Sequence, residues 1–131
     1  MPIWIPESAI RAFHAELLVE HSGVQSRIDE NLLGATLGRP QQMFTYAEPT
    51  PSVFQLAAAY GYGFAKNHCF TDGNKRVALV AIDVFLQLND YELVALEVEA
   101  VAVIIQLASN AMSETELATW IENNSTPLQG G

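Results

Sequence analysis

The sequence is poor in the features that mark secreted and membrane proteins. Its single cysteine, Cys69, excludes an internal disulfide. No uninterrupted apolar run reaches the roughly 18 residues that a membrane-spanning helix requires. The first residues lack the basic cluster and the long apolar stretch of a signal peptide. We therefore expect a cytoplasmic protein without a membrane segment.

Positive charge is also scarce. Six Lys and Arg residues stand against 15 Asp and Glu residues, which gives a formal net charge of -9. This balance argues against binding to nucleic acid, because contacts to its phosphate backbone need clustered cations. Half of the cations, Lys66, Lys75 and Arg76, nevertheless fall within one short window. A small positive region on an acidic body suits a compact anion such as a nucleotide.

Apolar residues at helical spacing, in contrast, are abundant. Half of the 131 residues are hydrophobic, which is enough for one domain with a single core. We predict an all-α domain over residues 1–123 and a frayed tail over residues 124–131. The fourth and fifth helices should be central because their apolar faces are the widest, with Val98, Val101 and Ile105 inward on the fifth. The six predicted helices cover about residues 6–21, 29–37, 51–67, 73–88, 97–110 and 113–123.

A segment without helical periodicity lies between the second and third predicted helices. Pro40 and Pro49 flank it, and it is rich in Thr, Tyr and Phe. Pro40 would follow the end of the second helix, and Thr50-Pro51 would cap and start the third. We predict an irregular flap or a short hairpin between Arg39 and Pro49.

The loop between the third and fourth predicted helices, residues 68–76, combines several reactive groups. Histidine is the side chain that titrates near neutral pH, so His68 is suited to take a proton from an attacking hydroxyl. Asp72 supplies a carboxylate oxygen of the kind that binds Mg²⁺ beside phosphates. Phe70 alternates in polarity with these two residues, so we expect it to point inward and anchor the loop.

The end of the same loop is suited to an anion. Gly73 permits close backbone approach, and the amides after it point toward an anion with the helix dipole behind them. Asn74 can cap the fourth helix or bond a phosphate oxygen. Lys75 and Arg76 can neutralise phosphate charge, and the guanidinium can bind in a fork. Together with the base and the carboxylate, these groups indicate a nucleotide-phosphate site for group transfer.

Each of these residues alone also has a structural explanation. Asp72-Gly73-Asn74 is a common turn and helix cap, and Lys75-Arg76 is a typical solvated helix face. Cys69 suits a small buried apolar position better than a reactive one. The coincidence of all the groups at one junction between a loop and a helix is what favours the phosphate site.

A transition-metal site is the alternative for the histidine and the carboxylate. His68 and Asp72 would need further ligands, and His14 and His21 lie on a helix that we expect to be distant. The sequence therefore disfavours this alternative.

At residues 68–76 the sequence resembles the Fic/Doc family, and within it the Doc (death-on-curing) toxin branch. The family pattern is His-x-Phe-x-Asp/Glu-Gly-Asn-x-Arg in a loop before a central helix, and this segment fits it at every specified position. The likeness extends to the second helix region at 28–40, a helix end at 84–89 and the last helix at 113–120. It covers about residues 6–123.

The resemblance implies an activity and roles for these residues. Family members transfer a group from a nucleoside triphosphate such as ATP, with Mg²⁺, to a hydroxyl of a target protein. His68 would be the general base and Asp72 the metal-side carboxylate. Gly73 and Asn74 would form an anion hole, and Arg76 would pair with phosphates. The flap that docks the target segment would consist of Gln42, Met43, Phe44, Thr45 and Tyr46.

Two departures from the family pattern bear on which group is transferred. Adenylylating members usually have Gly where this chain has Lys75, and a second Arg where it has Leu79. The Asn-Lys-Arg variant is instead similar to the Doc branch, whose prototype is a protein kinase that acts on a translation elongation factor. The resemblance therefore favours phosphoryl transfer to a Ser or Thr hydroxyl of such a factor. Adenylyl transfer by the same site and an inactive binding module with this fold are the alternatives.

The resemblance also raises the question of control. Residues 26–31 fit the Ser/Thr-x-x-x-Glu-Gly/Asn pattern of self-inhibited Fic proteins. They fall at the start of the predicted second helix, so we interpret the fit as a chance match. Without a built-in inhibitory helix, a Doc-like toxin needs a separate antitoxin that covers the site.

Overall fold

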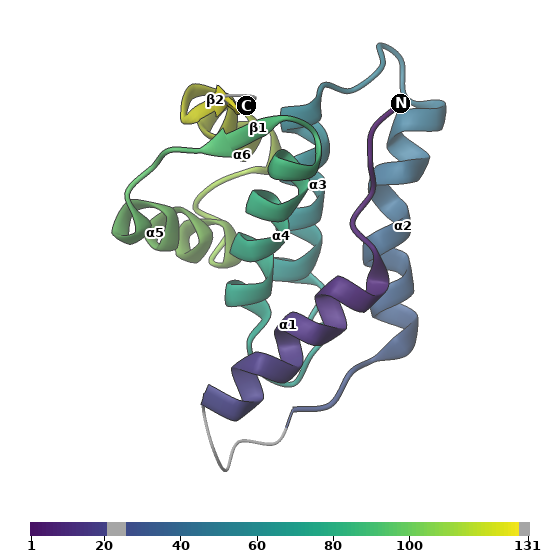
Figure 1. Cartoon of the computed structure of the whole chain (residues 1–131), viewed down its shortest axis with the longest axis vertical. Coiled ribbons are helices and arrows are strands. Elements are labelled where there is room, and N and C mark those ends of the chain that lie inside the picture. The colour runs from purple at the N-terminus through teal and green to yellow at the C-terminus, as the bar shows by residue number, and fades with distance from the viewer. Residues whose placement is uncertain (21–25, 129–131) are drawn as a thin grey trace.

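The computed structural model describes residues 1–20 and 26–128. Six helices among these residues confirm the predicted all-α domain, and a two-stranded sheet lies at one end of it (Figure 1). None of the described helices is long and apolar enough to cross a membrane. The elements are α1 (Glu7–Glu20), α2 (Glu30–Tyr46), α3 (Val53–Lys66), α4 (Asn74–Leu88), β1 (Tyr91–Leu93), α5 (Glu97–Ala108), α6 (Glu114–Asn123) and β2 (Ser125–Pro127).

Helix α3 is the centre of the fold, and α2, α4, α5 and α6 all contact it. Residues 56–65 of α3 are buried, except for the half-buried Tyr62. Small residues in this stretch let the neighbouring helices approach closely. At Gly61, an added Cβ would lie 2.5 Å from Ile82 Cδ1 on α4. The prediction that the fifth helix would be central is therefore wrong.

Helix α5 also turns a different face inward than the sequence predicted. Val98, Val101 and Ile105 are exposed, with 76%, 42% and 51% of their surface accessible. Helix α5 is apolar on nearly all sides, so periodicity alone does not define its buried face. The buried residues are Ala100, Val103, Ile104 and Leu107.

The predicted flap is wrong, because α2 continues through Pro40 to Tyr46. Pro40 removes one backbone hydrogen bond, but it is buried, and the residues after it are held by packing. The Phe44 ring lies 5.9 Å from the Trp4 ring, and Met43 also packs against the core. Tertiary contacts therefore keep the helix intact beyond the proline.

Residues 42–46 are also in the wrong place for the docking role that the resemblance implied. They form the end of α2, whereas residues 68–76 follow the opposite end of the adjacent α3 (Figure 1). Helix α3 has 14 residues, so it separates the two regions by about 20 Å. Its start also differs from the prediction. Ser52 forms a capping box with Gln55, whereas Thr50-Pro51 was expected to cap this helix.

The prediction of a frayed tail is wrong for residues 125–127, because they form β2. This strand pairs antiparallel with β1, with Tyr91 opposite Pro127 and Leu93 opposite Ser125. Three-residue strands are too short to leave a periodic pattern, so the sequence did not predict them. The predicted capping box at Ser113 and Glu116 is confirmed.

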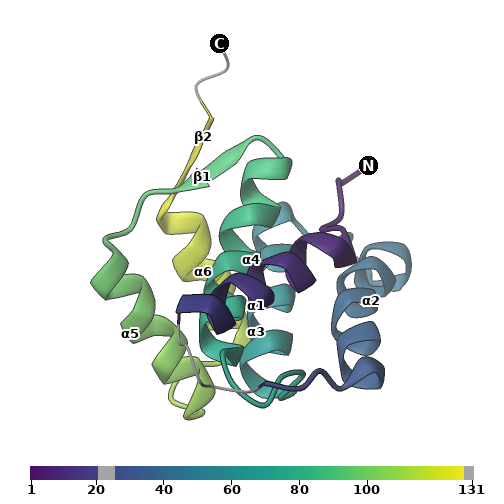
Figure 2. The ribbon, with the colours of Figure 1, turned by 60° about the horizontal axis from the view of Figure 1, so that its bottom comes forward.

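Helix α1 crosses near the start of α4, at the end of the domain where α3 leads into α4 (Figure 2). Ile10 and Leu17 of α1 are buried. The predicted end of this helix at His21 lies outside the described residues. Helix α1 therefore covers the region that contains residues 68–76.

Candidate active site

The segment 68–76, here called the motif loop although it includes the first turn of α4, borders a cavity of about 750 Å³. Cavities of this size are typical of small-molecule sites. Helix α1 contributes His14 and Leu17, the end of α3 contributes Lys66, and α5 contributes Ile105. The motif loop residues that line the cavity are His68, Thr71, Asp72, Gly73, Asn74, Lys75 and Arg76.

The two apolar residues of the motif loop point into the core. Phe70 is 2% exposed, and its ring lies between those of His14, 4.1 Å away, and Phe64, 6.2 Å away. Cys69 is fully buried, with its Sγ 3.2 Å from Thr36 Oγ1. Burial raises the pKa of the Cys69 thiol. The thiol therefore stays protonated and acts as a small buried group.

Asn74 closes the motif loop upon itself. Its Nδ2 donates to the Phe70 carbonyl at 2.7 Å, and its Oδ1 accepts from the Phe70 amide at 3.1 Å. The cap position of α4 is Gly73, so the Asn74 side chain is not the helix cap. The Asn74 side chain therefore shapes the loop, and its amide nitrogen has a second N–H besides the one that bonds Phe70.

The backbone at the start of α4 is suited to an anion. Gly73 has a φ of +90°, a left-handed conformation that glycine adopts without strain. The first amides of an α-helix have no partner within the helix, and they point outward along its axis. Lys75 and Arg76 are exposed in this first turn. Positive charge and helix amides therefore meet at one cavity wall.

His68 and Asp72 are both exposed to the same cavity. His68 has a φ of +52°, which is uncommon for a residue with a side chain. This conformation occurs where the chain turns from the end of α3, so that the next two residues enter the core. Backbone strain of this kind is frequent at functional sites.

Lys66, the third cation of the predicted positive region, closes the side of the cavity near α5. Its Nζ donates to Asn110 Oδ1 and, at 3.4 Å, to the carbonyl of Ala108. Lys66 therefore fastens the end of α3 to the end of α5.

The sequence interpretation missed the contributions of His14 and Ser26. His14 was assigned to a distant helix, but it is 3% exposed, stacks on Phe70 and lines the cavity. Its Nε2 lies 2.8 Å from Ser26 Oγ. Burial lowers the pKa of His14, against a smaller opposing effect of Asp72. His14 shares the buried stripe of Ile10 and Leu17, so its spacing was the available signal.

Residues 26–29, here called the strap, run antiparallel to the motif loop. The Asp29 amide donates to the Cys69 carbonyl at 2.7 Å, and the Thr71 amide donates to the Arg27 carbonyl at 3.0 Å. Ile28 and Phe70 form the β-bridge between the two segments. The strap therefore supplies hydrogen-bond partners to the backbone of the motif loop.

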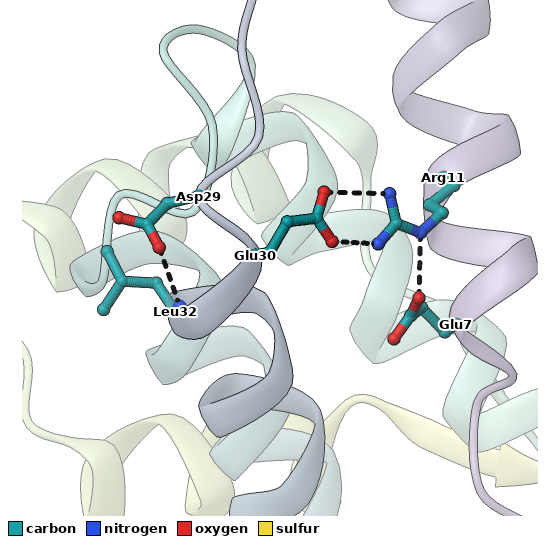
Figure 3. A network of polar contacts seen from close by, with 5 residues as sticks. All are labelled: Glu7, Arg11, Asp29, Glu30 and Leu32. Carbon is teal, nitrogen blue, oxygen red and sulfur yellow. Dashed lines mark hydrogen bonds and ion pairs between the residues drawn. The ribbon is translucent and has the colours of Figure 1, made fainter.

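The strap leads into α2 through a group of charged residues (Figure 3). Asp29 caps α2 by accepting from the Leu32 amide at 3.1 Å. Glu30 forms a two-pronged ion pair with Arg11 of α1, and Arg11 Nε also donates to Glu7 at 2.9 Å. The bond from Arg11 lowers the pKa of Glu30. Glu30, the glutamate of the self-inhibitory pattern, thus joins α1 to α2.

The alternative of a transition-metal site receives no support. Among residues 1–20 and 26–128, no group of three His, Cys, Asp or Glu side chains could hold a metal ion by itself. Mg²⁺ bound beside phosphates does not need such a group, because it is held by one or two carboxylates together with the phosphates and water. Asp72, exposed next to the start of α4, fits that requirement.

The fold and the site define a class of protein. Residues 4–86 match the family model described as the Fic/DOC family, and this match covers more than half of the chain. The chain therefore belongs to the Fic/DOC family.

Two curated relatives are similar to part of the chain. Toxin Doc of Mycolicibacterium smegmatis is 39% identical over 67 residues, 51% of this chain and 52% of the relative. Protein kinase doc of Escherichia phage P1 is 34% identical over 84 residues, 64% of this chain and 65% of the relative. The similarity thus spans about half to two thirds of each relative.

Proposed function

We propose that this chain is a Doc-like toxin that transfers the γ-phosphoryl group of ATP to a Ser or Thr hydroxyl of a target protein. The observation that carries the proposal is the meeting of His68, Asp72 and the cationic start of α4 around one cavity. The similarity to proteins named toxin and protein kinase supports it. We propose a translation elongation factor as the target, on the resemblance to the Doc branch alone.

Each group has a role in the proposed reaction. His68 takes the proton of the attacking hydroxyl, whose oxygen forms a bond to the γ-phosphorus. The bond from the γ-phosphorus to its bridging oxygen breaks, and the nucleoside diphosphate leaves with that electron pair. Lys75, Arg76 and the amides after Gly73 stabilise the charge on the phosphates. Mg²⁺, held on the protein side by Asp72, would neutralise further phosphate charge.

The first experiment combines the purified protein with ATP and a purified elongation factor. ATP labelled on the γ-phosphate should label the factor, and ATP labelled on the α-phosphate should not. The His68→Ala variant should lose about 10²- to 10⁴-fold in rate, the usual contribution of a general base. If His68→Ala keeps the full rate, the assignment of His68 as base is wrong.

Arg76 is tested against an arginine outside the cavity. Arg76→Gln should lower the rate by about 10²- to 10³-fold, because a group that stabilises transition-state charge is lost. Arg39→Gln is the matched control, since Arg39 binds Glu114 of α6 through two hydrogen bonds of 2.8 and 2.9 Å. Equal losses in both variants would mean that charge or stability, and not phosphate binding, explains the effect.

Adenylyl transfer by the same site is the second candidate. Lys75 at the start of α4 and Leu79 one turn later favour phosphoryl transfer. Leu79 lines an adjoining pocket of about 360 Å³, where adenylylating members would present a second arginine. In the Lys75→Gly variant, transfer of the γ-phosphate should fall more than any transfer of AMP. Label from the α-phosphate on the target of the wild-type protein would instead establish adenylyl transfer.

A toxin of this kind needs a cognate antitoxin, and we propose that one covers the site. The adjoining pocket is lined by Lys75, Arg76, Glu97 and apolar residues of α1, α4 and α5, and its residues Val101 and Ile105 are exposed. Such a surface suits an amphipathic segment with acidic residues. Expression of the wild type should arrest growth, and expression of His68→Ala should not. Arrest by both would favour an inactive binding module.

A further inference from the structure

A single hydroxyl holds the backbone of Asp72 at both its polar atoms. Ser26 Oγ accepts a hydrogen bond from the Asp72 amide at 3.1 Å and donates one to the Asp72 carbonyl at 3.2 Å. The two residues are 46 positions apart in the chain. In a β-sheet, a neighbouring strand bonds the amide and the carbonyl of a residue, and here the Ser26 hydroxyl bonds both groups of Asp72. Ser26 therefore fixes the peptide groups on both sides of the Asp72 side chain.

His14 holds Ser26 from the other side. Because the only proton of the hydroxyl goes to the Asp72 carbonyl, His14 Nε2, 2.8 Å from Ser26 Oγ, must be the donor. In the neutral imidazole, this arrangement places the proton on Nε2. The His14 ring is also held in place, since it stacks on Phe70 at 4.1 Å with 21° between the rings. A continuous chain of contacts thus runs from α1 to the backbone of Asp72, a residue that lines the cavity.

Among the residues that the structure describes, Arg11 and His14 join α1 to the strap region by hydrogen bonds, and the bond from His14 leads to Asp72. Arg11 and His14 lie three positions apart, on one face of α1. Arg11 binds Glu30, which begins α2 (Figure 3). The bond from His14, in contrast, continues through Ser26 to the backbone of Asp72. The two connections can therefore be separated by mutation.

We propose that His14 and Ser26 are positioning residues that hold the Asp72 carboxylate toward the phosphate side of the cavity, where it can ligate Mg²⁺. The inference rests on the proposed function, because the role of Asp72 beside Mg²⁺ belongs to that function. Neither residue takes part in the transfer itself. Groups that orient a metal ligand typically contribute about 10- to 100-fold to metal affinity or activity.

The test measures Mg²⁺ dependence in two ways. Calorimetry follows the binding of the non-hydrolysable ATP analogue AMP-PNP at a series of Mg²⁺ concentrations, and labelled ATP gives kcat and KM. Ser26→Ala should raise the Mg²⁺ concentration for half-maximal binding about 10- to 100-fold and lower kcat, with KM for the target protein unchanged. Ser26→Thr, which keeps the hydroxyl, should restore both values.

Three further variants separate positioning from folding. Thr119→Ala removes a hydroxyl that bonds a carbonyl of its own helix α6, and should leave Mg²⁺ dependence unchanged. Arg11→Gln removes the ion pair with Glu30 and should also leave Mg²⁺ dependence unchanged. His14→Phe keeps an aromatic ring against Phe70 but loses Nε2. It should shift Mg²⁺ dependence in the same direction as Ser26→Ala, by a smaller factor.

Each outcome bears on the inference. Unchanged Mg²⁺ dependence in Ser26→Ala would overturn it, and so would an equal shift in Arg11→Gln, because the attachment of α1 as a whole would then position Asp72. If His14→Phe shows the Mg²⁺ dependence of the wild type, His14 only packs against Phe70, and its proposed positioning role is wrong. The Asp72→Asn variant distinguishes a failure of the proposed function from a failure of this inference. If Asp72→Asn leaves Mg²⁺ dependence unchanged, the proposed role of Asp72 fails, whereas a shift there without one in Ser26→Ala refutes only this inference.

Discussion

Substitution of Gly73 tests whether the start of α4 depends on a left-handed backbone conformation at this residue. Its φ is +90°, and a residue with a Cβ is less stable there by about 1–2 kcal/mol. The added Cβ would lie 3.2 Å from Leu17 Cδ1 and 3.9 Å from His14 Cδ2. The nearer contact is tight, but the end of a leucine side chain can move by a few tenths of an ångström. The backbone conformation therefore accounts for most of the expected effect.

We predict that Gly73→Ala lowers the free energy of unfolding by about 1–2 kcal/mol. For a chain of this length, that change lowers Tm by roughly 3–8 °C. Urea denaturation at fixed pH measures the free energy directly. Gly73→Asn should lose less, because asparagine adopts left-handed backbone angles more readily than alanine. Both variants should bind AMP-PNP more weakly, since the amides after residue 73 change direction.

Comparison of the two variants decides the cause. Equal losses for Ala and Asn would assign the effect to the contact with Leu17, and Leu17→Ala would then suppress it. No loss in either variant would refute the reasoning. Gly34→Ala is the control for a glycine inside a helix: nothing lies within 4 Å of its added Cβ, so this variant should gain up to about 1 kcal/mol.

Three further predictions concern the helices and the base of the motif loop. Gly61→Ala should destabilise by about 1–3 kcal/mol in urea denaturation, because its Cβ would lie 2.5 Å from Ile82 Cδ1; a gain like that of Gly34→Ala would contradict this. Phe70→Ala should cost about 3–5 kcal/mol, since the ring is 2% exposed, and a loss below 1 kcal/mol would exclude its role as an anchor. Burial lowers the pKa of His14 in the folded chain below the value of 6.5 in the unfolded chain. As the pH falls below 6.5, the unfolded chain therefore binds the proton first, and the free energy of unfolding should decrease. Urea denaturation from pH 7 downward should show this loss in the wild type and less of it in His14→Gln, and equal pH dependence in both would refute the assignment.

The parts of this fold that depend on neighbours in sequence could be predicted from sequence. The capping box of Ser113 and Glu116 is one example, because its partners lie three positions apart. The motif loop is another, since its reactive groups occupy nine consecutive residues. Their shared cavity wall follows from the junction of one loop with one helix.

Other features depend on contacts that no local pattern contains. In the sequence, Pro40 predicts the end of a helix. The packing of Met43 and Phe44 against the core explains why α2 nevertheless continues. The face of α5 was assigned wrongly because its apolar residues surround the helix. The strand at 125–127 exists only through its pairing with 91–93.

The candidate site has the same division between local and distant contacts. Asn74 holds Phe70 from within the motif loop, but the strap supplies the hydrogen-bond partners for the backbone of Cys69, Thr71 and Asp72. The nine residues of the motif loop therefore do not specify their own geometry. A chain with an intact motif loop and a displaced strap would keep every reactive group and still lose their arrangement. For this reason, substitutions at Ser26 should resemble a weakened Asp72 variant, although Ser26 lies outside the motif loop.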